Sequence, residues 1–250
     1  MTNKYNYFVA NWKMFGNIKS INSTNKVIKI SKLRKFRKAK IIYCPPYTLI
    51  SDFVKKLRKT KIEVGAQNCH HSNLFGPFTG CINAKMIKNL GCNYVIIGHS
   101  ENRKSGDTDL IINKKIKSSL SSKLNIFFCI GETFKEKNEK RTKLILSKQI
   151  KKGLDKIKIT KKIIIAYEPV WSIGTGLIPN KRELSENILF IKKLLKKNFN
   201  INHQRVLYGG SVTSKNVREL SQIKHIDGFL VGGASLNPNK FIDIIKKTFN

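Results

Sequence analysis

The chain has 250 residues, and its 49 lysines and arginines against 15 aspartates and glutamates give a net charge of +34. A hydrophobic share of 40% excludes an intrinsically disordered protein, and no apolar run approaches the ~18 residues that a membrane-spanning helix needs. The first residues lack the apolar segment and small-residue cleavage site of a secretory signal, so we expect a cytoplasmic protein with no membrane association.

Eight short apolar runs recur along the chain and are separated by longer segments with helical spacing. Many of these runs are apolar at every position, which is typical of parallel strands that are covered on both faces. They predict strands at 7–10, 40–43, 62–66, 94–97, 125–129, 163–167, 205–208 and 228–231.

Helical spacing is clearest after the sixth predicted strand, where Asn180 is a suitable N-cap. A helix with one apolar face is predicted there by the i, i+3, i+6, i+7 spacing of Ile188, Ile191, Leu194 and Leu195. A similar pattern predicts a last helix around Phe241, Ile244 and Ile245.

Eight strands that alternate with helices, at about 31 residues per unit, predict a (β/α)8 barrel. No low-complexity linker divides the chain, so we expect one domain over residues 1–250. The competing doubly wound sheet would carry a Gly-x-Gly-x-x-Gly turn after an early strand, and the chain has none. A P-loop motif is absent as well.

Barrel enzymes place their chemistry where strands end and the following loops begin. The residues directly after the predicted strands are Asn11, Lys13, His99, Glu101, Glu168, the pair Gly209-Gly210, Ser211, and the pair Gly232-Gly233. Each has an ordinary structural explanation when it is considered singly, such as a solvated lysine or a strand end before proline. Their common placement at strand ends favours a functional site.

These residue types predict proton transfer on a small phosphorylated substrate. A carboxylate in a partly apolar pocket has a raised pKa and can act as a base. An imidazole can polarise a carbonyl, and an ammonium stabilises a developing oxyanion. Consecutive glycines let backbone N–H groups approach a phosphate closely. The reaction predicted is proton abstraction next to a carbonyl, which needs no metal and no cofactor.

The five cysteines are Cys44, Cys69, Cys81, Cys92 and Cys129. Their odd number and irregular spacing do not form a disulfide framework, and no Cys-x-x-Cys pair is present. Adjacent residues such as those of Cys69-His70-His71 seldom reach one tetrahedral metal centre together. We therefore expect free thiols in a reducing compartment and no metal site.

Six blocks of the chain closely resemble the triosephosphate isomerase family in order and spacing, from residue 6 to the C-terminus. The blocks are Asn11-Trp12-Lys13-Met14, Gly98-His99-Ser100-Glu101, Ala166-Tyr167-Glu168-Pro169-Val170-Trp171, Ile173-Gly174-Thr175-Gly176, Tyr208-Gly209-Gly210-Ser211-Val212, and the stretch 227–236. The resemblance implies interconversion of dihydroxyacetone phosphate and D-glyceraldehyde 3-phosphate through an enediolate.

The resemblance also implies a role for each matching residue. Glu168 would be the base and His99 the neutral electrophile. Lys13 would lie against the negative charge of the substrate, with Asn11 beside it and Glu101 as a supporting carboxylate. The phosphate would be bound by the N–H groups of Gly174, Ser211, Gly232 and Gly233.

Two loops resemble mobile or interacting parts of that family. Residues 169–179 resemble a lid that excludes water, which would otherwise favour elimination of phosphate from the enediolate. Residues 69–80 resemble an arm that enters a partner subunit and places Thr79 near the partner's Asn11 and the partner's Lys13. A homodimer is therefore expected.

The chain departs from the family pattern at Cys81, where a Glu is usual, and at Asn102, where an Arg is usual. In the family these two charges pair across the dimer interface. Loss of one partner would leave a buried charge unpaired at a cost of several kcal/mol, but loss of both can be nearly neutral. We expect the dimer to persist with a neutral contact at this point.

Pro179 stands where the family commonly has Ala, at the C-terminal hinge of the lid. In the family, the N–H of that residue bonds the hydroxyl matching Tyr208 when the lid closes, and proline has no N–H. We expect this hydrogen bond to be absent. Tyr208→Phe should then cost less activity than in an enzyme with Ala at the hinge, and less than a hundredfold, which corresponds to about 2.7 kcal/mol.

The net charge of +34 supports one alternative, a barrel protein with a polyanion-binding or scaffold role. The lysines are scattered along almost every predicted helix instead of forming one stripe, which argues against specific nucleic-acid binding. A protein that had lost the enzymatic role would be expected to lose Lys13, His99 or Glu168. All three are present, which favours the isomerase.

Overall fold

The structure of the chain, a computed structural model, describes residues 6–158, 161–201 and 204–249. Within these ranges eight parallel strands close into a barrel in sequence order, because β8 pairs with β1. The strands are β1 Asn6–Asn11, β2 Ala39–Cys44, β3 Glu63–Ala66, β4 Tyr94–Ile97, β5 Asn125–Ile130, β6 Ile163–Tyr167, β7 Val206–Tyr208 and β8 Gly228–Val231. Each predicted strand is confirmed, with ends within one residue of the prediction.

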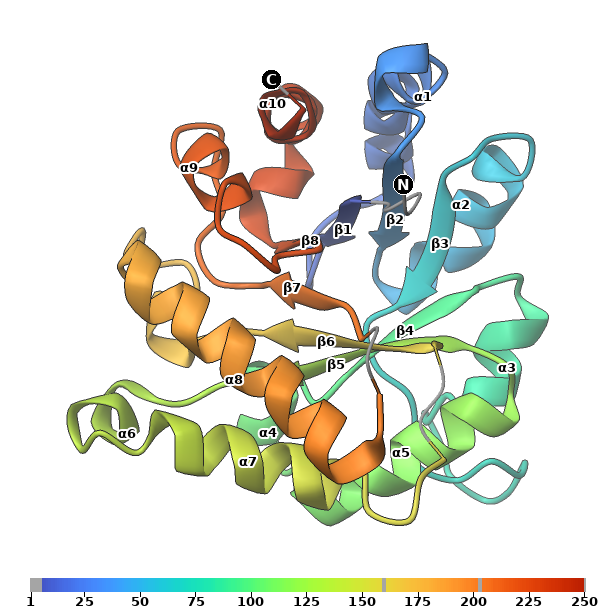
Figure 1. The fold of residues 1–250 in the computed structure, drawn as a ribbon. Helices are drawn as coiled ribbons and strands as arrows, with labels where there is room; N and C mark the ends of the chain where they lie inside the picture. The colour runs from blue at the N-terminus through green and yellow to red at the C-terminus, as the bar shows by residue number, and fades with distance from the viewer. Residues whose placement is uncertain (1–5, 159–160, 202–203, 250) are drawn as a thin grey trace.

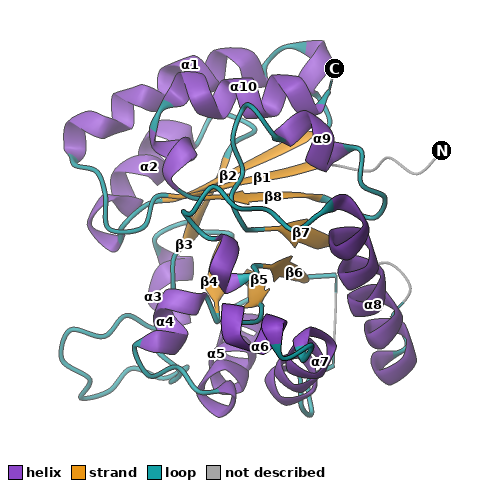
Figure 2. Cartoon of the chain, turned by 90° about the vertical axis from the view of Figure 1, so that its left-hand side faces the viewer, coloured by secondary structure: helices purple, strands orange, loops and turns teal. Residues whose placement is uncertain are grey.

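Helices surround the strands on the outside of the barrel (Figure 1). The α-helices are α1 Thr24–Ser31, α2 Ile50–Leu57, α3 Ala84–Asn89, α4 Ser100–Lys104, α5 Asp109–Ser121, α6 Phe134–Asn138, α7 Thr142–Gly153, α8 Lys181–Phe199, α9 Val217–Ser221 and α10 Pro238–Thr248. The 3-10 helices are η1 Ile18–Ser23, η2 Arg34–Phe36, η3 Tyr47–Leu49, η4 Val170–Ser172 and η5 Gly233–Leu236. Figure 2 shows the same arrangement from the side. The predicted (β/α)8 barrel is confirmed.

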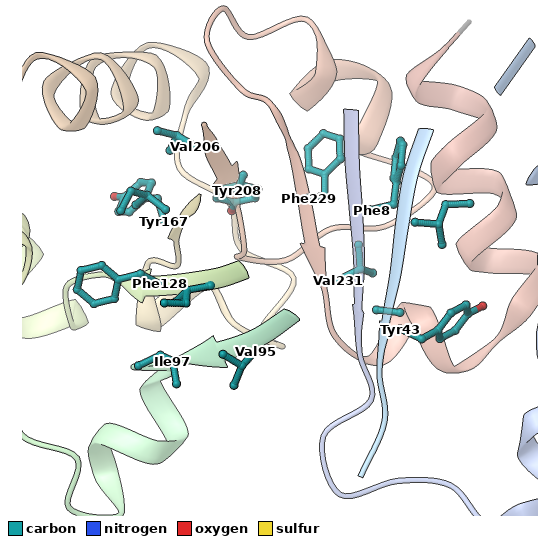
Figure 3. Packing of buried hydrophobic residues seen from close by; sticks show 14 of the residues in the cluster. Phe8, Tyr43, Val95, Ile97, Phe128, Tyr167, Val206, Tyr208, Phe229 and Val231 are labelled. Atoms are coloured by element: carbon teal, nitrogen blue, oxygen red, sulfur yellow. The ribbon is translucent and has the colours of Figure 1, made fainter. Parts of the chain in front are cut away.

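The strands are apolar on both faces because each face is covered. Alternate residues such as Phe8 and Phe128 point outward and pack under the helices (Figure 3). Their neighbours form a second apolar cluster inside the barrel, as Val9 and Phe127 do. This double coverage explains why the strand pattern in the sequence is continuous instead of alternating.

The amino end of the barrel interior is filled by aromatic rings. Tyr94 stacks on Phe127 with ring centroids 5.0 Å apart, and Tyr7 contacts the same ring edge-on at 6.4 Å. The Arg205 guanidinium lies 4.9 Å from the centroid of the Tyr7 ring. Toward the carboxyl ends of the strands the interior carries smaller side chains, including Cys129 and Ala166. Open space near the barrel axis is therefore found at the carboxyl end.

The predicted helix after the sixth strand is confirmed as α8. The Asn180 side chain accepts a hydrogen bond from the Glu183 N–H at 2.8 Å and so caps the first turn. The predicted apolar face packs inward, with Leu194 half-buried and with Ile188, Ile191 and Leu195 fully buried. Helix α10 likewise buries Phe241, Ile244 and Ile245.

The five cysteines are free thiols, of which Cys81 is exposed and the other four are buried. Over the described ranges, no group of three or more His, Cys, Asp or Glu side chains could hold a metal ion. None of the helices in the described part of the chain is both long enough and apolar enough to cross a membrane.

Candidate active site

Five side chains predicted from strand ends come together at the carboxyl end of the barrel. Asn11 is the last residue of β1, and Lys13 follows two residues later. His99 and Glu101 lie at the start of α4, after β4, and Glu168 directly follows β6. The barrel brings together residues that are up to 157 positions apart in the sequence, from Asn11 to Glu168.

A continuous series of polar contacts joins four of these side chains. The Lys13 ammonium donates to Glu101 Oε1 at 2.6 Å. The other oxygen of Glu101 lies 3.5 Å from His99 Nδ1, and His99 Nε2 lies 3.7 Å from Glu168 Oε1. An ammonium, an imidazole and two carboxylates thus surround one small volume.

The backbone of Lys13 is held in a conformation that non-glycine residues rarely adopt, with φ at 54°. Two hydrogen bonds fix it directly, and a third anchors the side chain that makes one of them. The Lys13 N–H donates to Asn11 Oδ1 at 3.1 Å, and the Gln67 amide donates to the carbonyls of Lys13 and Cys44 at 2.8 and 2.9 Å. Surrounding structure commonly holds such strain at functional sites, where it aims a side chain. Here it directs the ammonium to Glu101.

His99 has its protonation pattern set by the helix that follows it. Its Nδ1 accepts a hydrogen bond from the Glu101 N–H at 3.2 Å, as the N-cap of α4. An Nδ1 atom that accepts a hydrogen bond leaves the ring proton on Nε2. Nε2 is the nitrogen closer to Glu168, so the imidazole presents an N–H donor toward the base candidate and the cavity.

Glu168 is 2% exposed, and this burial raises the pKa of its carboxyl group. The His99 ring facing Glu168, a hydrogen bond with Cys129 and the charge of Lys13 oppose the shift without cancelling it. Gly209 leaves room for this side chain, because a Cβ there would lie 2.5 Å from Glu168 Cγ. A carboxylate with a raised pKa is suited to accept a proton near neutral pH.

The pKa of the second carboxylate, Glu101, shifts in the opposite direction. Burial acts to raise the pKa of Glu101, but the hydrogen bond from Lys13, the interaction with His99 and the charges of Lys13 and Lys104 outweigh it and lower the pKa. Two carboxylates whose environments move their pKa values apart take different roles in proton-transfer sites. Glu101 is suited to hold Lys13 in place, and Glu168 to accept and return a proton.

A cavity of about 180 Å³ lies beside these groups. The residues that line it include all four predicted phosphate-binding positions, Gly174, Ser211, Gly232 and Gly233, together with Asn11, Lys13, His99 and Glu168. A Cβ added at Gly233 would meet no atom within 4 Å, and one at Gly232 would meet only Lys13 Cε at 3.6 Å. The backbone of this glycine pair is thus accessible to a bound anion.

The other glycine pair, Gly209-Gly210, has a packing reason to lack side chains. Gly209 makes room for Glu168, and a Cβ at Gly210 would lie 2.3 Å from the Tyr208 hydroxyl oxygen and 2.5 Å from Ser172 Oγ. The Ser211 N–H that follows donates to Ser172 Oγ at 3.2 Å. In this structure the Ser211 N–H therefore already has a protein partner, unlike the open backbone at Gly232.

The predicted lid segment 169–179 contacts the cavity through Ile173 and Gly174. Its Trp171 indole N–H donates to Glu132 Oε1 at 2.9 Å, and the Lys137 ammonium lies 3.7 Å from the centroid of the Trp171 ring. The Tyr208 hydroxyl lies 2.9 Å from Ser172 Oγ. The missing N–H of Pro179 thus does not leave Tyr208 without a hydrogen bond to this segment.

Sequence reasoning missed three residues of this region, namely Glu132, Gln67 and Ser172. Glu132 is fully buried, accepts hydrogen bonds from Trp171 and Tyr167, and has its pKa raised by burial. Glu132 and Gln67 follow β5 and β3 closely, so the strand-end rule could have found both. Ser172 lies within a loop, and no pattern in the sequence distinguishes it.

The fold and the site define a (β/α)8 barrel protein that carries an imidazole and a buried carboxylate beside a small, glycine-lined cavity. Two comparisons identify the family. The triosephosphate isomerase family profile matches residues 6–248. The chain is 41% identical to the triosephosphate isomerase of Thermodesulfovibrio yellowstonii over 96% of this chain and 98% of that one. The chain therefore belongs to the triosephosphate isomerase family.

Two further relatives agree with this assignment. The triosephosphate isomerase of Dictyoglomus turgidum is 40% identical over 95% of this chain and 97% of its own. The crystal structure of triosephosphate isomerase from Bartonella henselae superposes with a TM-score of 0.88 at 34% identity, and the match covers 97% of this chain and 98% of that one. The resemblance seen in the six sequence blocks is confirmed.

Proposed function

We propose that the chain interconverts dihydroxyacetone phosphate and D-glyceraldehyde 3-phosphate, with Glu168 as the base. The observation that carries this assignment is the contact series from Lys13 through Glu101 and His99 to Glu168 beside one cavity. The alternative of a polyanion-binding scaffold has only the net charge in its favour. Family membership supports the isomerase.

The reaction moves one proton between neighbouring carbons and a second between the oxygens that these carbons carry. The Glu168 carboxylate takes a proton from the carbon next to the carbonyl, and the C–H electron pair becomes the C=C bond of the enediolate. Negative charge then develops on the former carbonyl oxygen, where the His99 Nε2–H and the Lys13 ammonium stabilise it, with Asn11 beside them. The Glu168 carboxylic acid then returns the proton to the former carbonyl carbon, which takes the C=C electron pair for the new C–H bond. The neighbouring hydroxyl oxygen gives up its proton and becomes the new carbonyl, and the former carbonyl oxygen gains a proton, a transfer that His99 would relay. These groups supply all the proton transfers, with no cofactor.

The phosphate group would bind in the same cavity as the base. We assign it to the backbone N–H groups of Gly232 and Gly233, together with those of Ser211 and Gly174. Before the Ser211 N–H can bind phosphate, its hydrogen bond to Ser172 must break. Segment 169–179 would act as the lid that excludes water from the enediolate.

We also propose a homodimer formed through the arm at residues 69–80. Figure 1 shows this loop extending from the barrel at the teal part of the chain. Large apolar side chains are exposed along it and beside β1, notably Leu74 at 71%, Phe75 at 62% and Met14 at 94%. Exposed apolar surface of this kind marks interaction sites.

A second hollow supports the proposed dimer. It adjoins Lys13 and is lined by Gln67 and Asn102, among others, and it would receive the partner's Thr79. Cys81 and Asn102 are both uncharged, so no unpaired charge opposes the contact. Size-exclusion chromatography with light scattering at micromolar protein tests this, and a monomer would contradict it. The four buried free thiols fit a reducing, cytoplasmic compartment.

A coupled assay with glyceraldehyde 3-phosphate tests the activity, with Glu168→Asp and His99→Gln as the site variants. Both variants should lower turnover if the assigned roles hold. Inhibition by phosphoglycolate, a planar mimic of the enediolate, tests the base, the electrophile and the phosphate site together. Unchanged turnover in both variants would disprove the mechanism.

A further inference from the structure

One hydroxyl group joins the lid segment to the wall of the cavity. Ser172 is completely buried, although Gly174, Thr175 and Gly176 of the same loop are exposed. Its Oγ donates to the Leu177 carbonyl at 2.6 Å, which closes the loop on itself. The same Oγ lies 2.9 Å from the Tyr208 hydroxyl and accepts the Ser211 N–H at 3.2 Å.

These three contacts use the full hydrogen-bonding capacity of the serine hydroxyl. A hydroxyl has one O–H to donate and two lone pairs to accept with. Its proton goes to Leu177, so the Tyr208 hydroxyl must donate to it, as the Ser211 N–H does. The hydroxyl thereby connects both ends of the exposed loop tip to the end of β7.

Two other features show that the chain is built around this junction. Gly210 has no space for a side chain because a Cβ would lie within 2.5 Å of both Ser172 Oγ and the Tyr208 oxygen. Pro179, at the other end of the lid segment, has no N–H to offer to Tyr208. Among the described residues, the Tyr208 hydroxyl has one direct hydrogen bond to the lid segment, and it is made with Ser172.

We propose that Ser172 is a positioning residue that holds the lid against β7 through Tyr208 and releases the Ser211 N–H when phosphate binds. This inference rests on the proposed isomerase function. Ser172 does not line the cavity and so touches no substrate. It acts through Ile173 and Gly174, the next two residues, which do line it.

Release of the Ser211 N–H from Ser172 predicts a result that a purely structural role of Ser172 would not produce. Ser172→Ala removes the hydrogen bonds that hold the lid, so turnover should fall by about tenfold. The same change frees the Ser211 N–H, so inhibition by inorganic phosphate should be unchanged or tighter. A lid that had merely lost its fold would weaken phosphate binding together with turnover.

The experiment measures kcat, KM and the inhibition constant of inorganic phosphate for the native protein, Ser172→Ala, Tyr208→Phe and the double variant. The double variant should be no slower than Ser172→Ala alone, because both changes break one connection. Phosphate released during turnover should rise in Ser172→Ala, since a loosely held lid exposes the enediolate to elimination. Ser221→Ala in α9, whose hydroxyl donates to the Arg218 carbonyl at 2.7 Å, is the control and should behave as native.

A kcat of Ser172→Ala within twofold of native would overturn the proposal, as would independent, multiplying losses in the double variant. A rise in the inhibition constant of phosphate in parallel with the fall in kcat would also overturn it. If Ser172→Ala does not fold, Tyr208→Phe tests the proposal instead. Its kcat should fall by about tenfold, and a fall of less than twofold would contradict the proposed role of Ser172. A native chain with no isomerase activity would instead refute the proposed function.

Discussion

The two ends of the barrel interior differ in how their polar groups are accommodated. At the amino end, Arg205 lies over the Tyr7 ring and donates to its hydroxyl, and Tyr94 stacks on Phe127, so aromatic surface and charge are paired. At the carboxyl end, Lys13 has a strained backbone and Glu168 is buried with a raised pKa.

The two ends of the barrel therefore serve different purposes. The amino end is packed for stability, because large rings fill it and leave little space. The carboxyl end retains unfavourable features, since a relaxed lysine and a solvated carboxylate would not perform the proposed chemistry. Substitutions at the carboxyl end should therefore mainly lower activity, and substitutions at the amino end should mainly lower stability.

The largest expected loss of activity comes from Glu168→Gln. The amide cannot accept the proton, and general-base catalysis typically contributes roughly a hundredfold to ten-thousandfold. The coupled isomerase assay should show a kcat loss in that range, while circular dichroism should show an unchanged fold. Native turnover would exclude Glu168 as the base.

Phe127→Ala should have the opposite profile. Truncation of this fully buried ring is expected to lower the free energy of unfolding by roughly 3 to 5 kcal/mol, because it leaves a cavity at the amino end. Turnover per folded molecule should stay within about threefold of native, since the ring does not line the active-site cavity. Urea unfolding and the coupled assay measure the two quantities. A large kcat loss in folded protein would show that the two ends are coupled.

Gly209→Ala should affect activity by displacing Glu168, whose Cγ would lie 2.5 Å from the new Cβ. Misplacement of a catalytic group by about 1 Å can cost roughly a hundredfold. Gly153→Ala is the matched control, because its Cβ would meet the outward-facing Phe128 ring at 2.4 Å, away from the cavity. In the control variant the main effect should be a lower melting temperature, with only a small effect on kcat. Equal kcat losses in both variants would contradict the assigned role of Gly209.

The acid limb of kcat/KM reports the pKa of Glu168 in the free enzyme. Burial raises this pKa, so activity should be lost on acidification at a pH above the ordinary Glu value of about 4.3. A pH profile measured at constant ionic strength checks this. An acid limb at or below the ordinary value would show that Glu168 is effectively solvated.

The smallest expected effect is a stability gain in Glu168→Gln. Because the folded-state pKa is raised, ionisation of Glu168 costs stability once the pH exceeds the unfolded-state value, and the full cost is present above the folded-state pKa. Glu168→Gln should then melt above the native protein at pH 7, and the difference should vanish below about pH 4. A lower melting temperature at pH 7 would contradict this sign.

Local patterns in the sequence were enough to predict the strands, the barrel and the residues that follow each strand. Continuous apolar runs such as 163–167 are typical of strands buried on both faces, and the strand ends of a parallel barrel meet at one end. Asn11, Lys13, His99, Glu101 and Glu168 could therefore be named as neighbours before any coordinates were known. Their adjacency follows from local patterns together with the closure of the sheet.

How these residues are held depends on contacts between distant parts of the chain. The φ of 54° at Lys13 depends on Gln67, which lies 54 positions away, and the burial of Ser172 depends on Tyr208. The Gly209-Gly210 pair could indicate an anion site in the sequence, yet its missing side chains make room for Glu168 and for the Ser172–Tyr208 hydroxyls. Hydrogen bonds and steric limits between distant residues arise from packing, and a one-dimensional pattern does not contain them.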